Sequence, residues 1–233
     1  MRLFAISDLH LSFGVDKPMD IFGPQWVGHA DRMREAWDEM VGPEDWVLVA
    51  GDTSWGLNLE QALPDLQWLG ERPGNKILIR GNHCTWWRSR RKVDAVLHPS
   101  IRTLQNDAVP MPDGTVVIGG RLWDPPDAPW ADENAEKIFN RELGRLRLSI
   151  AAGKELTGDR TLALVHYPPR YTDGRVTAVV PLLQDAGVST CVYGHLHGKD
   201  HKHGFQGEAG GVRYYLTSCD AIDFKPMEIF LDP

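Results

Sequence analysis

Short apolar runs at widely separated places in this chain each end in side chains suited to binding a metal ion. The endings are Asp8-Leu9-His10, Gly51-Asp52, Gly81-Asn82-His83, His166 and Gly194-His195-Leu196-His197. Near-continuous apolar runs such as 47–50 are typical of strands that are buried on both faces. Because ligand-binding groups collect at the carboxyl ends of strands in an open α/β sheet, we expect these endings to meet at one edge of a sheet.

Strand and helix patterns alternate in the first half of the chain, and strands follow one another more closely towards its end. The helix pattern at 59–70, for example, repeats apolar residues at Ala62, Leu66 and Leu69 and can end at Gly70. The alternation predicts an α/β/α sandwich built on a mixed sheet. We expect strands at 3–7, 46–50, 76–80, 116–119, 162–166, 190–194, 214–217 and 227–231, and helices at 29–41, 59–70 and 132–153.

Size, charge and cysteine content limit the classes of protein that fit. The chain has 233 residues, and we expect one domain over 1–233. Its net charge of −7 gives no general attraction to nucleic acid or anionic lipid. Cys84, Cys191 and Cys219 are odd in number and widely spaced, which argues against disulfides and fits a reducing cytoplasm. No stretch approaches the roughly 20 apolar residues of a membrane span, so we expect a cytoplasmic protein with no membrane partner.

The polar endings have the composition of a site for two metal ions. Side chains two residues apart in an extended segment point to the same side, so Asp8 with His10, and His195 with His197, are expected to converge on one pocket. Carboxylate, amide and imidazole ligands together suit manganese, iron, zinc or nickel better than the all-oxygen shell of calcium. Paired metals of this kind are suited to hydrolysing phosphate esters.

The ordered set of endings from residue 8 to residue 197 resembles the calcineurin-like metallophosphoesterase family. The resemblance implies an α/β fold, a four-layer α/β/β/α sandwich of mixed sheets with the metal site at the carboxyl ends of strands. It implies one ion held by Asp8, His10, Asp52 and His197 and a second held by Asp52, Asn82, His166 and His195, with Asp52 bridging the two. His83 would face the phosphate as a general acid or charge stabiliser.

The expected activity is binuclear metal-dependent hydrolysis of phosphate esters by a metal-bridging hydroxide. Phosphodiesters are the first choice, with cyclic nucleotides as one substrate class and manganese as the expected metal. The partner is then a small phosphate ester, and the acidic balance disfavours a polynucleotide. A phosphomonoesterase and a nuclease are the enzymatic alternatives. A non-catalytic scaffold is also an alternative, but such a protein would be expected to lose ligands or His83, and all are present.

One residue departs from the family pattern. The family usually continues Gly-Asn-His with an acidic residue that orients the histidine, whereas this chain has Cys84 after His83. A thiol is a poor hydrogen-bond acceptor for imidazole. Either Cys84 weakens the acid step and makes the enzyme depend on good leaving groups, or it is a tolerated small residue. A redox role for Cys84 is a third interpretation with less to support it.

Several residues near the endings are weaker candidates for binding substrate. Trp86 and Trp87 are placed to stack on a base, but such tryptophans more often pack behind loops, and packing is the expected role. Arg121 follows a strand end and would reach a phosphate only if it faces the site. The basic run at 88–92 is expected to be a solvated helix face. The long loop at 11–26 directly follows the first ending, a position where loops are often functional.

Overall fold

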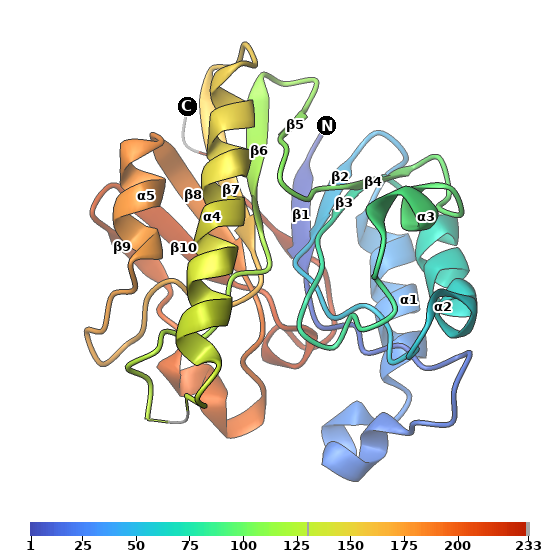
Figure 1. The fold of residues 1–233 in the computed structure, drawn as a ribbon. Coiled ribbons are helices and arrows are strands. Elements are labelled where there is room, and N and C mark those ends of the chain that lie inside the picture. The colour runs from blue at the N-terminus through green and yellow to red at the C-terminus, as the bar shows by residue number, and fades with distance from the viewer. Residues whose placement is uncertain (130, 232–233) are drawn as a thin grey trace.

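The centre of the structure is a pair of β-sheets packed against each other (Figure 1). The structure is a computed structural model that describes residues 1–129 and 131–231. The first sheet has the order β11-β1-β2-β3-β4, in which β1 to β4 are parallel and β11 pairs antiparallel with β1. Its strands are β1 Leu3–Ile6, β2 Trp46–Val49, β3 Asn75–Leu78, β4 Ile101–Thr103 and β11 Met227–Glu228.

The second sheet has the order β5-β6-β7-β8-β10-β9. Its four central strands are parallel, and antiparallel strands close both edges. A turn at Asp113-Gly114 joins β5 to β6, where the Met111 amide donates to the Thr115 carbonyl at 2.8 Å. The strands are β5 Val109–Pro110, β6 Thr115–Gly120, β7 Arg160–Val165, β8 Val188–Tyr193, β9 Gly207–Ala209 and β10 Val212–Leu216.

Helices cover the outer face of each sheet and complete four layers (Figure 1). The first sheet carries α1 His29–Met40, α2 Leu59–Glu71 and the short α3 Arg90–Asp94, and the second carries α4 Ala135–Lys154 and α5 Val179–Asp185. Phe4 and Val47 pack towards the helices, whereas Ala5 and Leu48 pack towards the other sheet. The parallel strands are apolar at successive positions because both of their faces are buried. The expected α/β/β/α sandwich is confirmed.

The single mixed sheet expected from the strand–helix alternation alone is wrong, because the strands divide between two sheets. The sequence pattern also missed β4, β5, β9 and α5, which are all short elements. In the described residues, no helix is long and apolar enough to cross a membrane. Cys84, Cys191 and Cys219 are buried free thiols.

A buried lysine in β3 makes the stability of the fold depend on pH. The Lys76 ammonium donates to the Arg72 carbonyl and to Ser100 Oγ, and burial lowers the pKa of Lys76 from 10.5 to about 8. Between these two values the unfolded chain binds more protons than the folded one, so stability rises with pH from about 8 to 10.5. We therefore expect the free energy of unfolding of Lys76→Met, relative to wild type, to be highest near pH 7 and to fall by pH 10.

Urea denaturation at both pH values measures this difference. Lys137→Met, which removes an exposed lysine from α4, is the matched control and should track wild type at both. If the difference in free energy of unfolding between Lys76→Met and wild type is the same at both pH values, burial does not destabilise the charged form of Lys76.

Candidate metal centre

The predicted ligand-bearing endings converge at the carboxyl ends of β1, β2, β3, β7 and β8. Several of these residues leave their strands with left-handed backbone, at φ 59° for Asp8, 46° for His10, 48° for Asp52 and 74° for His195. Such backbone costs roughly 1–3 kcal/mol per residue and is concentrated at functional sites, where the surrounding structure enforces it. Here it turns the side chains from neighbouring strands towards one another.

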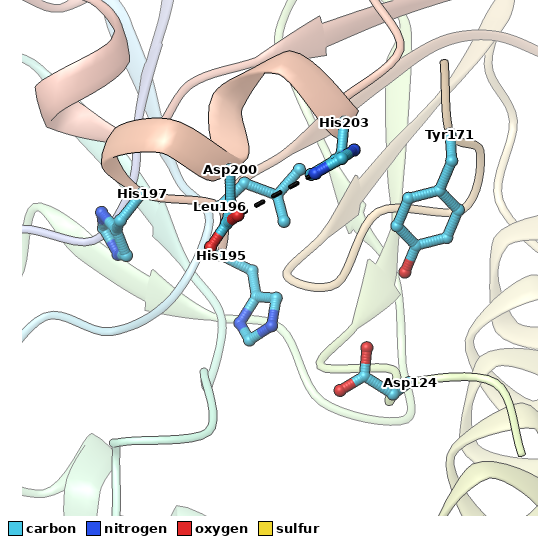
Figure 2. A pocket seen from close by; sticks show the side chains of 7 residues that line it. All are labelled: Asp124, Tyr171, His195, Leu196, His197, Asp200 and His203. Carbon is cyan, nitrogen blue, oxygen red and sulfur yellow. Dashed lines mark ion pairs between the residues drawn. The ribbon is translucent and has the colours of Figure 1, made fainter. Parts of the chain in front are cut away.

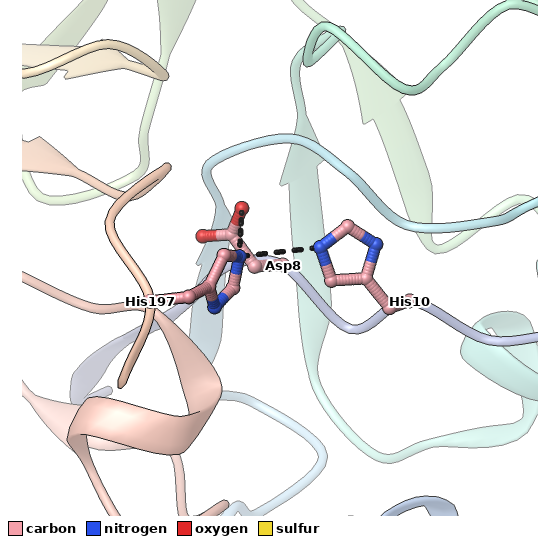
Figure 3. Close-up of side chains that lie close together, drawn as sticks. All are labelled: Asp8, His10 and His197. Atoms are coloured by element: carbon pink, nitrogen blue, oxygen red, sulfur yellow. Dashed lines mark hydrogen bonds and ion pairs between the residues drawn. The ribbon is translucent and has the colours of Figure 1, made fainter. Parts of the chain in front are cut away.

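Asp8, His10 and His197 form the first group (Figure 3). His10 Nε2 lies 3.2 Å from His197 Nε2, and Asp8 Oδ1 lies 3.5 Å from His197 Nε2. Two imidazole nitrogens that face each other bind well only if a proton or a cation lies between them. The group therefore has the arrangement of a ligand set.

One oxygen of Asp8 is held by the protein and the other is left available. Asp8 Oδ2 accepts hydrogen bonds from Ser7 Oγ at 2.5 Å, the His195 amide at 2.9 Å and Ser218 Oγ at 3.0 Å. Asp8 Oδ1 is buried and has no hydrogen-bond partner among the described residues. Neither serine was predicted as a site residue, although Ser7 and Ser218 both lie at strand ends.

Asp52, Asn82, His166 and His195 form the second group. His166 Nε2 lies 2.7 Å from Asn82 Oδ1 and 3.4 Å from Asp52 Oδ2, and His195 Nδ1 lies 3.1 Å from the same Asn82 oxygen. His166 Nδ1 donates to the Ala50 carbonyl at 2.8 Å, because a carbonyl oxygen only accepts. This bond leaves His166 Nε2 directed into the group as a lone-pair donor. Asp8, Asp52 and His166 also lie within reach of one ion, which joins the two groups.

Asp220, which was not predicted as a site residue, contacts the first group through His197. Its Oδ1 accepts a hydrogen bond from His197 Nδ1 at 2.8 Å, and its Oδ2 accepts one from the Gly198 amide at 2.9 Å and lies 3.1 Å from His201 Nε2. Carboxylates in this position orient a ligand histidine and raise its basicity. Asp220 follows β10 by a few residues, so the rule about strand ends would have found it. His201 contacts the same carboxylate as His197.

The residues present fit a cation. His10 Nδ1, like Asp8 Oδ1, is buried without a hydrogen-bond partner in the part of the chain that the structure describes. Burial lowers the pKa of His10 and His195 to about 3, so both rings are neutral and have a lone pair to offer a metal ion. Burial raises the pKa of Asp52, but the neighbouring His166 outweighs it and brings the pKa to about 2. Neutral imidazoles and ionised carboxylates are the forms that bind metal.

His83 lies at the edge of this centre with an aromatic neighbour. Its amide donates to Asp52 Oδ1 at 2.8 Å, and its ring centroid lies 4.5 Å from that of Trp55 and 5.6 Å from that of His10. Cys84 is buried behind Asp52, where its Sγ accepts from the Gly81 amide at 3.3 Å and lies 3.9 Å from Asp52 Oδ1. Burial raises the pKa of Cys84 to about 12, so it is a neutral thiol.

Replacing Cys84 by Asp tests the hypothesis that the thiol weakens proton delivery by His83. We expect Cys84→Asp to raise kcat on phosphate esters with poor leaving groups by about tenfold, a fraction of the roughly 10²–10⁴-fold that a complete general acid contributes. Activity on good leaving groups should change little, because they need no proton. The measurement is kcat across a series of aryl esters, with Cys84→Ser as the uncharged control. Parallel leaving-group dependences in both variants and wild type would leave Cys84 as a packing residue.

The weaker candidates lie away from the centre. Trp86 and Trp87 are 2% and 1% exposed and pack in the core beneath the first sheet, so they offer no ring face to a substrate. Arg121 pairs with Glu142 at 2.7 Å and lines a cavity that contains none of the predicted metal ligands. Arg121 does follow a strand end, but its side chain turns towards α4 and not towards the metal centre. In the basic run, Arg90 is partly structural and donates to Thr103 Oγ1 at 3.0 Å.

Comparisons with known proteins find relatives in sequence and in structure. In sequence, the Gene 66 protein of Mycobacterium phage D29 is 46% identical over 78 residues, and the Gene 66 protein of Mycobacterium phage L5 is 39% identical over 79 residues. Each match covers 33% of this chain and 37% of the relative, so the chain matches little more than a third of the length of these curated relatives.

Solved structures share the fold at low sequence identity. Phosphopantetheinyl hydrolase from Mycobacterium tuberculosis has a TM-score of 0.60 at 16% identity, with 100% of this chain and 96% of that chain covered. A protein of unknown function from Aquifex aeolicus has a TM-score of 0.54 at 16% identity, with 97% and 95% covered. Residues 1–199 match the family model for calcineurin-like phosphoesterases. The chain therefore belongs to the calcineurin-like phosphoesterase family, whose activity is metal-dependent hydrolysis of phosphate esters.

Proposed function

We propose that this protein hydrolyses small phosphodiesters, with cyclic nucleotides as the first substrate class. The observation that carries the proposal is a pair of cavities that flank the metal centre and share His197 and Asp200 in their walls. One cavity has a volume of about 580 Å³ and contains His10 and His83, and the other has a volume of about 380 Å³ and contains His195. A diester carries an organic group on each side of its phosphorus, whereas a monoester fills one side only.

The larger cavity suits a flat, negatively charged compound. Trp55 stacks on His10 at a centroid distance of 4.7 Å, and Lys17 Nζ lies 3.5 Å above the Trp55 ring. Phe22, from the loop that follows the first ligand pair, is 54% exposed at the cavity wall. Aromatic faces stack on nucleobases of any sequence, and lysine attracts phosphate. This combination supports a nucleotide over a simple sugar phosphate.

The smaller cavity has a different character (Figure 2). Asp124 and Tyr171 lie on one side of it, and Asp200 and His203 form an ion pair on another, at 4.0 Å. These groups offer carboxylate oxygens, an imidazole and a hydroxyl. They suit a hydroxyl-bearing part of the substrate, and the two cavities together would fix the direction in which an asymmetric diester binds.

The chain's own residues would divide the chemistry among them. Two bound divalent ions, with manganese proposed first and iron, zinc or nickel as alternatives, supply an activated water and neutralise the phosphoryl oxygens. Asp52 lies between the two ligand groups and would be shared by them. His83 lines the larger cavity and would deliver a proton to the departing oxygen there. We further propose a cytoplasmic location and a small phosphate ester as the partner.

Lys17 and Phe22 provide a test of the cavity that is independent of the metal ligands. We expect Phe22→Ala and Lys17→Met each to raise KM for a cyclic nucleotide by about tenfold, since stacking contributes about 1–3 kcal/mol per base. In Phe22→Ala the KM for a dialkyl phosphodiester should stay within about twofold of wild type, because that compound has no ring to stack in the cavity. Phe13→Ala, in the same loop but outside the cavity walls, is the control. Equal changes in KM for both substrates would show that the base of the nucleotide does not bind in the larger cavity.

A further inference from the structure

Four arginines surround a single carboxylate beside the metal centre. Glu142 of α4 is buried, and its Oε1 accepts hydrogen bonds from Arg121 at 2.7 Å, Arg145 at 2.9 Å and Arg141 at 3.0 Å. Arg80, which follows β3, lines the same cavity as Arg121 and Arg145. Arginine stays charged in proteins, so one carboxylate leaves this cluster with an excess of positive charge.

Part of this positive charge has no partner. The Nε atoms of Arg80 and Arg121 are buried and lack a hydrogen-bond partner within residues 1–129 and 131–231. The Arg121 side chain is only 9% exposed, so water compensates it poorly. Leaving a buried donor on a charged group unpaired is costly, and buried charges are normally paired or bound to an ion. The two Nε atoms therefore mark the place where an acceptor is missing.

The cavity between these arginines has room for such an acceptor. Its volume is about 20 Å³, which is enough for one oxygen-sized atom. The mouth is open to larger groups, because Arg145 is 35% exposed and a side chain added at Gly120 would meet no atom within 4 Å. Its walls offer guanidinium groups on several sides and one carboxylate, already occupied by arginines.

We propose that this cavity binds a small inorganic oxyanion of the size of phosphate, with one oxygen seated between Arg80 and Arg121 and the others facing Arg145. The planar guanidinium group matches the geometry of phosphate oxygens and forms strong charge-assisted hydrogen bonds with them. Glu142 orients the arginines without neutralising them. No residue assigned to the metal centre lines this cavity, so it would be a second anion site.

The site is placed to support the metal centre. Arg80 directly precedes the Gly81-Asn82 ending of the first sheet, and the carbonyl of Gly120, in the second sheet, accepts from the His166 amide at 3.3 Å. A bound anion would join strand ends of both sheets that carry predicted metal ligands. It would also relieve the repulsion between Arg80 and Arg121, which come from different sheets.

Calorimetric titration of the metal-loaded protein with inorganic phosphate tests the proposal. We expect two phosphate sites in wild type, one at the metal centre and one in the arginine cavity. Arg80→Met and Arg145→Met should each weaken one site by about tenfold and leave the other unchanged. Arg147→Met, which removes an exposed charge from the same helix, should keep both sites. The Arg145 side chain is 35% exposed, so Arg145→Met serves if Arg80→Met does not fold.

Three results would overturn the proposal. The first is a single phosphate site in wild type that disappears when the metal is chelated. The second is a pair of sites that Arg80→Met and Arg145→Met leave unchanged. The third is equal weakening in Arg147→Met, which would indicate general attraction to a basic surface. None of these outcomes depends on whether the enzyme cleaves diesters.

Discussion

Replacing Asp52 by Asn is expected to lower metal-dependent hydrolysis more than any other single change. The amide keeps an oxygen to accept from the His83 amide, which now donates to Asp52 Oδ1 at 2.8 Å, so the local backbone should hold. It removes the negative charge that both ligand groups would share. Losing about 4 kcal/mol of transition-state stabilisation from a metal pair corresponds to about 10³-fold in rate.

The measurement is kcat/KM of Asp52→Asn with saturating manganese, together with metal content per chain. Asp185→Asn, an exposed acidic residue at the end of α5, is the control and should behave as wild type. Thermal unfolding of both variants shows that the fold is retained. If the kcat/KM of Asp52→Asn stays within tenfold of wild type at the same metal content, Asp52 is not a ligand that both metal ions share.

Replacing Asp220 by Asn is expected to act through the metal rather than on the chemical step. Asp220 accepts from His197 Nδ1 at 2.8 Å, and this bond fixes which nitrogen His197 presents to the centre. The hydrogen bond to Asp220 and the nearby negative charge of Asp8 outweigh burial and raise the pKa of His197 to about 10. Outer carboxylates of this kind are worth about 10–100-fold in metal affinity or activity. We expect a loss in manganese affinity of that size.

Titration of metal-free protein with manganese measures this affinity directly. Excess manganese should restore most of the activity of Asp220→Asn, whereas it should not restore that of Asp52→Asn. The same Asp185→Asn variant controls for loss of an acidic residue. An unchanged manganese affinity in Asp220→Asn would show that His197 does not need this carboxylate for orientation.

The parts of the site that could be predicted from sequence are those fixed by strand ends. The apolar run at 47–50 forms β2, with Val47 facing the helices and Leu48 facing the other sheet, and Asp52 follows at its carboxyl end. The parallel pairing of neighbouring strands then brings such endings together, as it does for Asp52 and Asn82 near His166. The position of a strand end and the burial of both faces of a strand are local properties that a sequence pattern can report.

The features that could not be predicted depend on contacts between distant segments. Asp220 meets His197 only because β10 lies beside β8, and the strand pattern does not reveal that neighbour. The Arg121 side chain turns towards Glu142 of α4, and this direction depends on how α4 packs against the sheet. The division of the strands into two sheets is likewise invisible in the alternation of strands and helices. Short elements such as α5, which contains a proline, carry too little periodicity to be recognised.

The most direct test of the central claim is a manganese titration of metal-stripped protein with hydrolysis followed in parallel. An aryl phosphodiester and the corresponding monoester would be assayed side by side. We predict that two manganese ions bind per chain and that diester cleavage appears as the second ion binds. Two ions bound with no cleavage of either ester would contradict a phosphoester hydrolase and favour a scaffold, whereas cleavage of the monoester alone would contradict the diester proposal.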